Sequence, residues 1–176
     1  MKRIFIISFL ALFIGLQTSA QGSLTGRVYH CANMLKTEMD QAKKDFKKDI
    51  EKEKDMSAVD KKETNELIQK MADAIVSTMT LTFLSDKELN LDMVAKYDDG
   101  KAKANGVPWM FRQMMKFKLG KKGKSASGKV PYTFDGKTVK LNSPKTKKEM
   151  IFQLSSDGKT LTYNKDGKPV LLTRTK

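Results

Sequence analysis

The pattern of apolar and polar positions divides the chain into a helical stretch near its N-terminus and a longer region of strands. Between residues 34 and 75, apolar residues recur every three or four positions, and lysine and aspartate fill the gaps, as on an amphipathic helix. The apolar stripe fades over residues 51–60, where Ser57 followed by Asp60 resembles a helix-capping pair. The pattern predicts either one bent helix or a helical hairpin at 34–75, and periodicity does not decide between the two.

From residue 77 onward the period changes to two, which is typical of antiparallel strands with one buried face. The alternation is strongest from Leu89 to Tyr97, and the preceding run from Met79 to Phe83 is expected to pair with it as a hairpin. A short strand is also expected within residues 24–31, before the helical stretch. The chain therefore predicts a mainly β fold with a helical insertion.

The segment after Tyr97 interrupts the strands. Pro108 suits the first turn of a short helix, where its missing N–H is not needed, and Trp109, Met110 and Met114 are expected to form a lid-like helical turn. Alternation then predicts strands at 115–119 and 130–134. Four further strands follow, with the sequences KTVKLN, KEMIFQLS, KTLTYN and KPVLLTRT.

The triplet Asp-Gly-Lys occurs four times, beginning at Asp99, Asp135, Asp157 and Asp166. Asp-Gly is the favoured pair for a two-residue type I′ hairpin turn, because both central residues need a positive φ. Three copies lie at expected strand junctions, so we interpret them as hairpin turns. The copy at Asp99 is expected to end a strand.

The first twenty residues read as a secretory signal that is removed on export, with Lys2 and Arg3 at the start, an apolar run and small residues up to Ala20. The run from Ile4 to Leu16 is shorter than the roughly 20 residues of a spanning helix, so no transmembrane anchor is expected in the mature chain. Residues 21–176 are predicted to form a single domain in the periplasm or outside the cell.

The formal net charge of +14 decides which partners an exported chain would meet. Export removes nucleic acid from consideration and leaves lipopolysaccharide, acidic glycans, anionic membrane surfaces or an acidic protein. Lysine-rich faces also keep a domain soluble and protect its sheet edges. Composition alone leaves both interpretations open.

Candidate chemistry is sparse. The single cysteine, Cys31, excludes an internal disulfide, and His30 beside it would point to the opposite face of a strand, so the two do not form a base and nucleophile. The Asp166 loop has Thr173 where a calcium loop needs its closing glutamate, and the clustered methionines are more typical of a core or pocket than of a copper site. We predict no catalytic residue, metal or cofactor, with a hydrolase built on paired carboxylates as a minor alternative.

The stretches LTFLSDKELNLDM, SGKVPYTFDGKTVKLN and MIFQLSSDGKTLTYNKDGKPVLLTR resemble the successive hairpins of lipocalin-like (calycin-type) domains of exported Gram-negative bacterial proteins. The resemblance implies an antiparallel up-and-down barrel of about eight strands, with either a small apolar cavity or a filled interior. Lipocalins open with Gly-x-Trp and pack a late arginine across that tryptophan. Gly26 and Arg174 stand at the corresponding ends, but Val28 replaces the tryptophan and Tyr29 follows it.

Two functional hypotheses follow. The first is a non-enzymatic binding protein that holds a small apolar ligand or a protein partner, with these candidate residues: Trp109, Met110, Met114, Phe117 and Tyr97. The alternative is a basic module that binds anionic surface polymers through lysines of helix 34–54 and through Lys116, Lys118, Lys121, Lys122 and Lys124.

Overall fold

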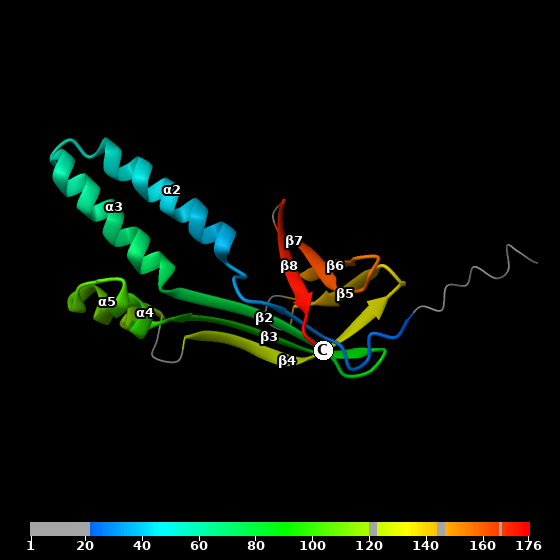
Figure 1. The fold of residues 1–176 in the computed structure, drawn as a ribbon. Helices are drawn as coiled ribbons and strands as arrows, with labels where there is room; N and C mark the ends of the chain where they lie inside the picture. Colours follow the sequence, from blue (N-terminus) through cyan, green and yellow to red (C-terminus); the bar gives the residue numbers. More distant parts are fainter. Residues whose placement is uncertain (1–21, 120–122, 144–146, 166) are drawn as a thin grey trace, which may run out of the picture.

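The computed structural model describes residues 22–119, 123–143, 147–165 and 167–176, so the expected signal at 1–20 lies outside the described residues. Eight antiparallel strands follow one another in chain order and close into a barrel, with β1 pairing to both β2 and β8 (Figure 1). This confirms the mainly β, up-and-down barrel with a helical insertion. The strands are β1 Val28–Cys31, β2 Ile75–Phe83, β3 Glu88–Tyr97, β4 Lys124–Phe134, β5 Thr138–Asn142, β6 Glu149–Leu154, β7 Thr160–Lys165 and β8 Lys168–Arg174.

Two pairs of helices interrupt the strands. Helices α2 (Lys36–Lys52) and α3 (Ala58–Asp73) separate β1 from β2, and α4 (Asp99–Ala104) and α5 (Trp109–Leu119) separate β3 from β4. The insertion is thus a helical hairpin rather than one bent helix. Ser57 decides where the second helix begins, because its Oγ accepts a hydrogen bond from the Asp60 N–H at 3.1 Å.

The barrel interior is occupied by one continuous cluster of side chains contributed by every strand. At one end, the ring of Phe83 meets those of Tyr29 and Tyr132 edge to face, at centroid distances of 5.9 and 5.0 Å. The Tyr29 hydroxyl donates to the carbonyl of Gly158 at 2.8 Å, and the Tyr132 hydroxyl donates to that of Ser85 at 2.9 Å. Of the two interiors that the lipocalin resemblance allows, this cluster of buried side chains among the described residues favours the filled one.

Strands β2, β3 and β4 extend beyond the part of the sheet that closes into the barrel. Pairing of β2 with β1 covers residues 79–82, whereas residues 75–78 of β2 pair with β3 and otherwise form one isolated bridge, from Ser77 to Asn33. The three strands therefore continue past the barrel wall as an arm that carries the described helices α2 to α5 (Figure 1). A second, smaller core of Ala74, Ala102 and Val107 joins α3, α4 and β3 on this arm.

One predicted strand is wrong. Residues 115–119 belong to α5, which continues without a break from Trp109. The alternation of Met115, Phe117 and Leu119 misled the prediction because five residues are too few to separate a period of two from a helical period. Over the whole element, Phe111, Met115 and Lys118 fall on one helical face.

The Asp-Gly-Lys triplets adopt other conformations than expected. Among the described residues, Gly136, Gly158 and Gly167 have positive φ, but Asp135 and Asp157 do not, so the junctions at 135 and 157 are not type I′ turns. Asp135 Oδ1 instead accepts hydrogen bonds from two following N–H groups, at 2.9 and 2.7 Å, and so closes an Asx-type turn. Asp166 lies outside the described residues.

The first triplet starts a helix rather than only ending a strand. Asp98 Oδ1 accepts a hydrogen bond from the Lys101 N–H at 2.9 Å and caps α4, in which Gly100 is an ordinary helical residue.

The two chain ends that correspond to the lipocalin tryptophan and arginine also differ from the lipocalin pattern. Arg174 is exposed and donates from Nε to the Lys176 carbonyl at 2.9 Å, while Tyr29, one residue after the usual tryptophan position, fills the barrel end.

Candidate ligand-binding site

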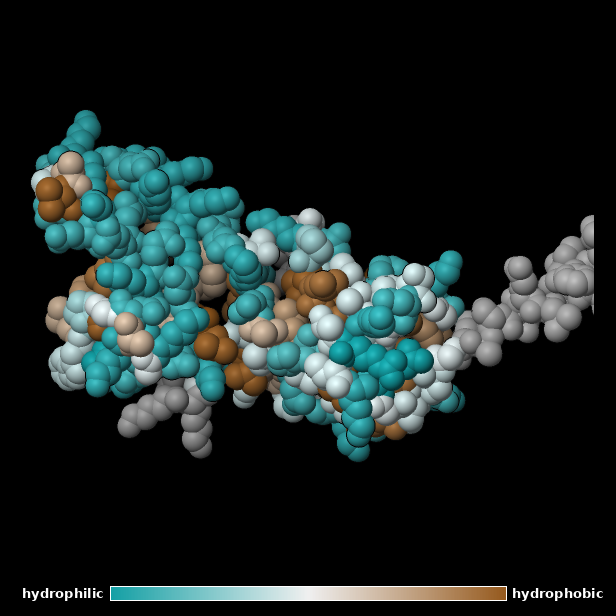
Figure 2. All heavy atoms as spheres, viewed as in Figure 1, coloured by the Kyte–Doolittle hydropathy of each residue, from teal (hydrophilic) through white to brown (hydrophobic). Residues whose placement is uncertain are grey.

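An apolar cleft of about 490 Å³ lies on the arm, between the α2/α3 hairpin and α5. Each helix contributes one apolar face to it. The main lining residues are Phe46, Leu67, Ile68, Met71, Met114 and Met115. Figure 2 shows brown apolar side chains in the notch between the two groups of helices. This cleft therefore lies beside the barrel and not inside it.

Helical periodicity explains why these residues share a cleft. On α3, Leu67, Ile68 and Met71 are spaced by one and three residues and so project from one side. On α5, Met114 and Met115 project from the side that faces the hairpin, together with Lys118. The arm strands hold the two helical groups apart, which leaves the facing sides only partly covered.

Two lysines at the cleft are in different electrostatic settings. The Lys43 ammonium lies 2.5 Å from Asp73 Oδ1, so its charge is balanced within the hairpin. Lys118, in contrast, is exposed and has no ion-pair partner among the residues that the structure describes. The rim of the cleft on the α5 side therefore carries an unbalanced positive charge. Thr64, on the hairpin side, also lines the cleft and carries a hydroxyl group.

Asp99, in the first turn of α4, forms ion pairs with two residues of α5. Its Oδ1 lies 3.1 Å from Arg112 Nη1, and its Oδ2 lies 2.8 Å from Lys116 Nζ. The hydrogen bond from Lys116 is the main cause that lowers the pKa of Asp99. Tyr97 packs into the small core next to these ion pairs, and burial raises the pKa of its hydroxyl. Within the described part of the chain, the Tyr97 hydroxyl has no hydrogen-bond partner.

The five predicted ligand-binding residues do not form one site. Met114 lines the cleft, and Tyr97 lies in the small core below it. Trp109, Met110 and Phe117 project from the opposite, outward side of α5, with 68%, 66% and 90% of their surface exposed. The short helix predicted around Trp109, Met110 and Met114 is present, but Phe117 was assigned to a strand, and three of the five candidate residues point away from the cleft.

The lysines proposed for anionic polymers are also divided. Lys116 is paired with Asp99, Lys118 lies at the rim of the cleft, and Lys124 is exposed at the start of β4. Lys121 and Lys122 lie outside the described residues.

Sequence reasoning missed the hairpin side of the cleft. Phe46, Leu67 and Met71 belonged to the predicted apolar stripes, whereas Ile68 was not assigned to a stripe. A stripe shows that a helix face is apolar, but it does not show whether another element covers that face. The only sequence signal was the abundance of methionine, which can line adaptable pockets but more often fills irregular cores.

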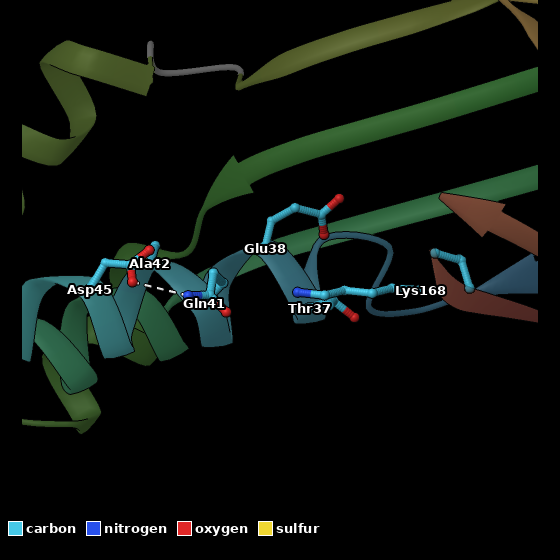
Figure 3. Close-up of a pocket in the computed structure, with 7 residues that line it drawn as sticks. Thr37, Glu38, Gln41, Ala42, Asp45 and Lys168 are labelled. Carbon is cyan, nitrogen blue, oxygen red and sulfur yellow. Dashed lines mark hydrogen bonds between the residues drawn. The ribbon is translucent and has the colours of Figure 1, made fainter. Parts of the chain in front are cut away.

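A second cavity, of about 380 Å³, lies between α2 and the start of β8 (Figure 3). Several of its lining residues carry polar groups: the Gln41 amide donates to Asp45 Oδ1 at 2.9 Å, and Lys168 extends from β8 toward Thr37 and Glu38. It offers much less apolar surface than the cleft. Searching the described residues also yields no group of His, Cys, Asp or Glu side chains suited to a metal ion.

Comparison with known proteins adds no relative to this picture, since no family model, curated protein or solved structure matches the chain. The functional argument therefore depends on the geometry of the cleft and on the residues around it.

Proposed function

We propose that this protein is an exported, non-enzymatic binding protein that holds one amphiphilic molecule, an apolar chain with an anionic head, in the cleft between the α2/α3 hairpin and α5. The observation that carries the proposal is that this cleft is apolar and open while the barrel is filled. The barrel then acts as the scaffold, and its extended strands present the binding arm.

The chemistry of the cleft favours this ligand class. Small-molecule sites are typically about 300–1,000 Å³, mostly apolar, and oriented by a few polar groups. The methionines at 71, 114 and 115 can adapt to a flexible chain better than branched side chains can. Lys118 at the rim supplies the positive charge for a carboxylate or phosphate head.

Export and family remain part of the same proposal. The composition of residues 1–20 is that of a signal peptide, which supports a periplasmic or extracellular location. The barrel topology supports a lipocalin-like domain whose ligand site has moved from the barrel to the arm. A function in binding anionic polymers through the α5 lysines has weaker support, because Lys116 is already paired with Asp99.

The test is a titration of the chain from Gln21 onward, the expected export product, with a fluorescent fatty acid. Saturable binding of one probe per chain is expected. Ile68→Gln, inside the cleft, should weaken binding about tenfold because it removes apolar contact with the probe. Leu171→Gln, on the outer surface of β8, is the matched control and should leave binding unchanged.

A second variant tests the head group. Lys118→Met should weaken binding of the fatty acid but not of the corresponding fatty alcohol, since only the acid carries a charge for Lys118 to neutralise. Absence of saturable binding, or equal effects of Ile68→Gln and Leu171→Gln, would contradict the proposed function. Circular dichroism spectra that match the parent protein would exclude unfolding as the cause.

A further inference from the structure

We propose that the outward face of α5 docks on the surface of a lipid bilayer that contains anionic lipid. The inference goes beyond the proposed function, because it concerns the side of α5 that points away from the cleft and names a different partner.

The first observation is an uncovered apolar helix face. Trp109, Met110, Met114 and Phe117 fall within an arc of about 140° on α5, at the 100° per residue of an α-helix, and Gln113 is the one polar residue within this arc. Phe117 and Trp109 are among the most exposed large apolar side chains of the described chain, and Met114 is 41% exposed. Single exposed apolar residues need no explanation, but four on one helical face form a patch.

The second observation is the charge around that patch. From Asp99 to Leu119 the chain has five basic residues and one acidic residue. On the helical wheel Lys116, which is paired with Asp99, borders the patch beside Trp109, and Lys118, which has no ion-pair partner among the described residues, borders it beside Met114. An apolar face with Trp and Phe, flanked on both sides by lysine, is the pattern of helices that lie in the interface of anionic membranes.

The same charges argue against a second copy of the chain as the occupant. Two α5 faces in contact would bring their flanking lysines together, and like charges at an interface oppose association. A bilayer surface with anionic lipid complements both features at once. Docking would be peripheral, because none of the described helices is long and apolar enough to cross a membrane, and α5 has 11 residues.

The position of α5 supports this occupant. Figure 1 places α5 at the end of the arm, far from the barrel, where a flat surface can approach it. Met114 belongs both to the outward face and to the lining of the cleft. The cleft therefore opens beside the docking face, so an amphiphile could pass between the bilayer and the cleft without crossing bulk water.

The experiment uses Trp109, the only tryptophan of the chain, as the reporter. The protein from Gln21 onward is mixed with vesicles of phosphatidylcholine alone or of phosphatidylcholine with phosphatidylglycerol. With the anionic vesicles, Trp109 emission should shift to shorter wavelength, acrylamide quenching should fall, and the protein should sediment with the lipid. Added salt should weaken the binding, since surface charges are screened.

Variants on the two sides of α5 separate this inference from the proposed function. Phe117→Ser should weaken partitioning into anionic vesicles about tenfold, because the most exposed apolar side chain is lost. It should leave fatty-acid binding unchanged, whereas Ile68→Gln should do the reverse. Leu171→Ser, which removes a half-exposed leucine from β8, is the control.

Four results would each overturn the inference. They are no shift of Trp109 emission with anionic vesicles, equal binding to neutral and anionic vesicles, equal loss in Phe117→Ser and Leu171→Ser, and a concentration-dependent dimer in sedimentation that Phe117→Ser abolishes. The last result would assign the face to a second copy of the chain. Binding that is selective for anionic lipid and lost in Phe117→Ser would support the inference.

Discussion

At the scale of single residues, three tyrosines differ in what their hydroxyl groups contact. Those of Tyr29 and Tyr132 donate to backbone carbonyls at the end of the barrel, whereas that of Tyr97 has no partner among the described residues. A buried hydroxyl contributes to stability only when it is hydrogen-bonded, since burial without a partner costs free energy.

Tyr29→Phe should therefore lower the free energy of unfolding by about 1 kcal/mol, because the Gly158 carbonyl loses its donor. Tyr97→Phe should leave the free energy of unfolding unchanged or raise it slightly. Urea denaturation of both variants measures the difference. An equal loss in the two variants would mean that Tyr97 has a partner, such as a bound water, that compensates its burial.

At the scale of elements, one carboxylate, that of Asp99, forms the ion pairs that join α5 to α4, beside the apolar contact of Phe111 with the small core. Because the folded-state pKa of Asp99 lies below the ordinary carboxylate value, the attachment is fully present above that value and is lost as the pH falls through the folded pKa. The anisotropy of Trp109 emission should therefore fall upon acidification below about pH 4, as α5 becomes mobile.

Asp99→Asn should show the lower anisotropy already at neutral pH and should lose the acid transition, because the amide cannot balance Arg112 and Lys116. Asp157→Asn is the matched control. The hydrogen bond from Ser155 is the main cause that lowers the pKa of Asp157, but this carboxylate lies in the turn between β6 and β7. If both variants keep the acid transition, Asp99 does not hold α5.

The elements also show how far the sequence predicts this structure. Long alternating runs such as Leu89–Tyr97 identified strands, and their short connections indicated a meander of antiparallel neighbours, whereas the closed barrel was expected only from the lipocalin resemblance. The five residues 115–119 were too short a window and were assigned to the wrong element. Ser57 was recognised as a cap, but a cap alone does not show that the chain reverses direction there.

The cleft was not predictable in the same way. The apolar faces of α3 and α5 were visible in the sequence, but which of them stays uncovered depends on how far β2, β3 and β4 extend past the barrel. That length becomes apparent only when the pairing partners of each strand are known, since β1 ends its pairing with β2 at Met79.

At the scale of the whole molecule, the barrel and the arm have separate hydrophobic cores, and strands β2, β3 and β4 run through both parts. The barrel core includes Phe152 and Leu91, and the arm core is built on Ala74, with Met71 packed against it. The arm core has far fewer buried side chains, and stability within a protein varies with such local packing. The arm should therefore open without unfolding the barrel, which suits a binding site that must admit a ligand.

Amide hydrogen exchange along β3 tests this separation, because one strand crosses both parts. Amides near Ala95 should exchange faster than those near Leu91, although both lie in continuous antiparallel pairing. Met71→Ala should increase exchange only on the arm side, while Phe152→Ala should cost about 3–5 kcal/mol and increase exchange throughout. Equal acceleration at Ala95 and Leu91 in Met71→Ala would mean that the two cores unfold as one unit, and a ligand would then have to enter the cleft without local opening of the arm.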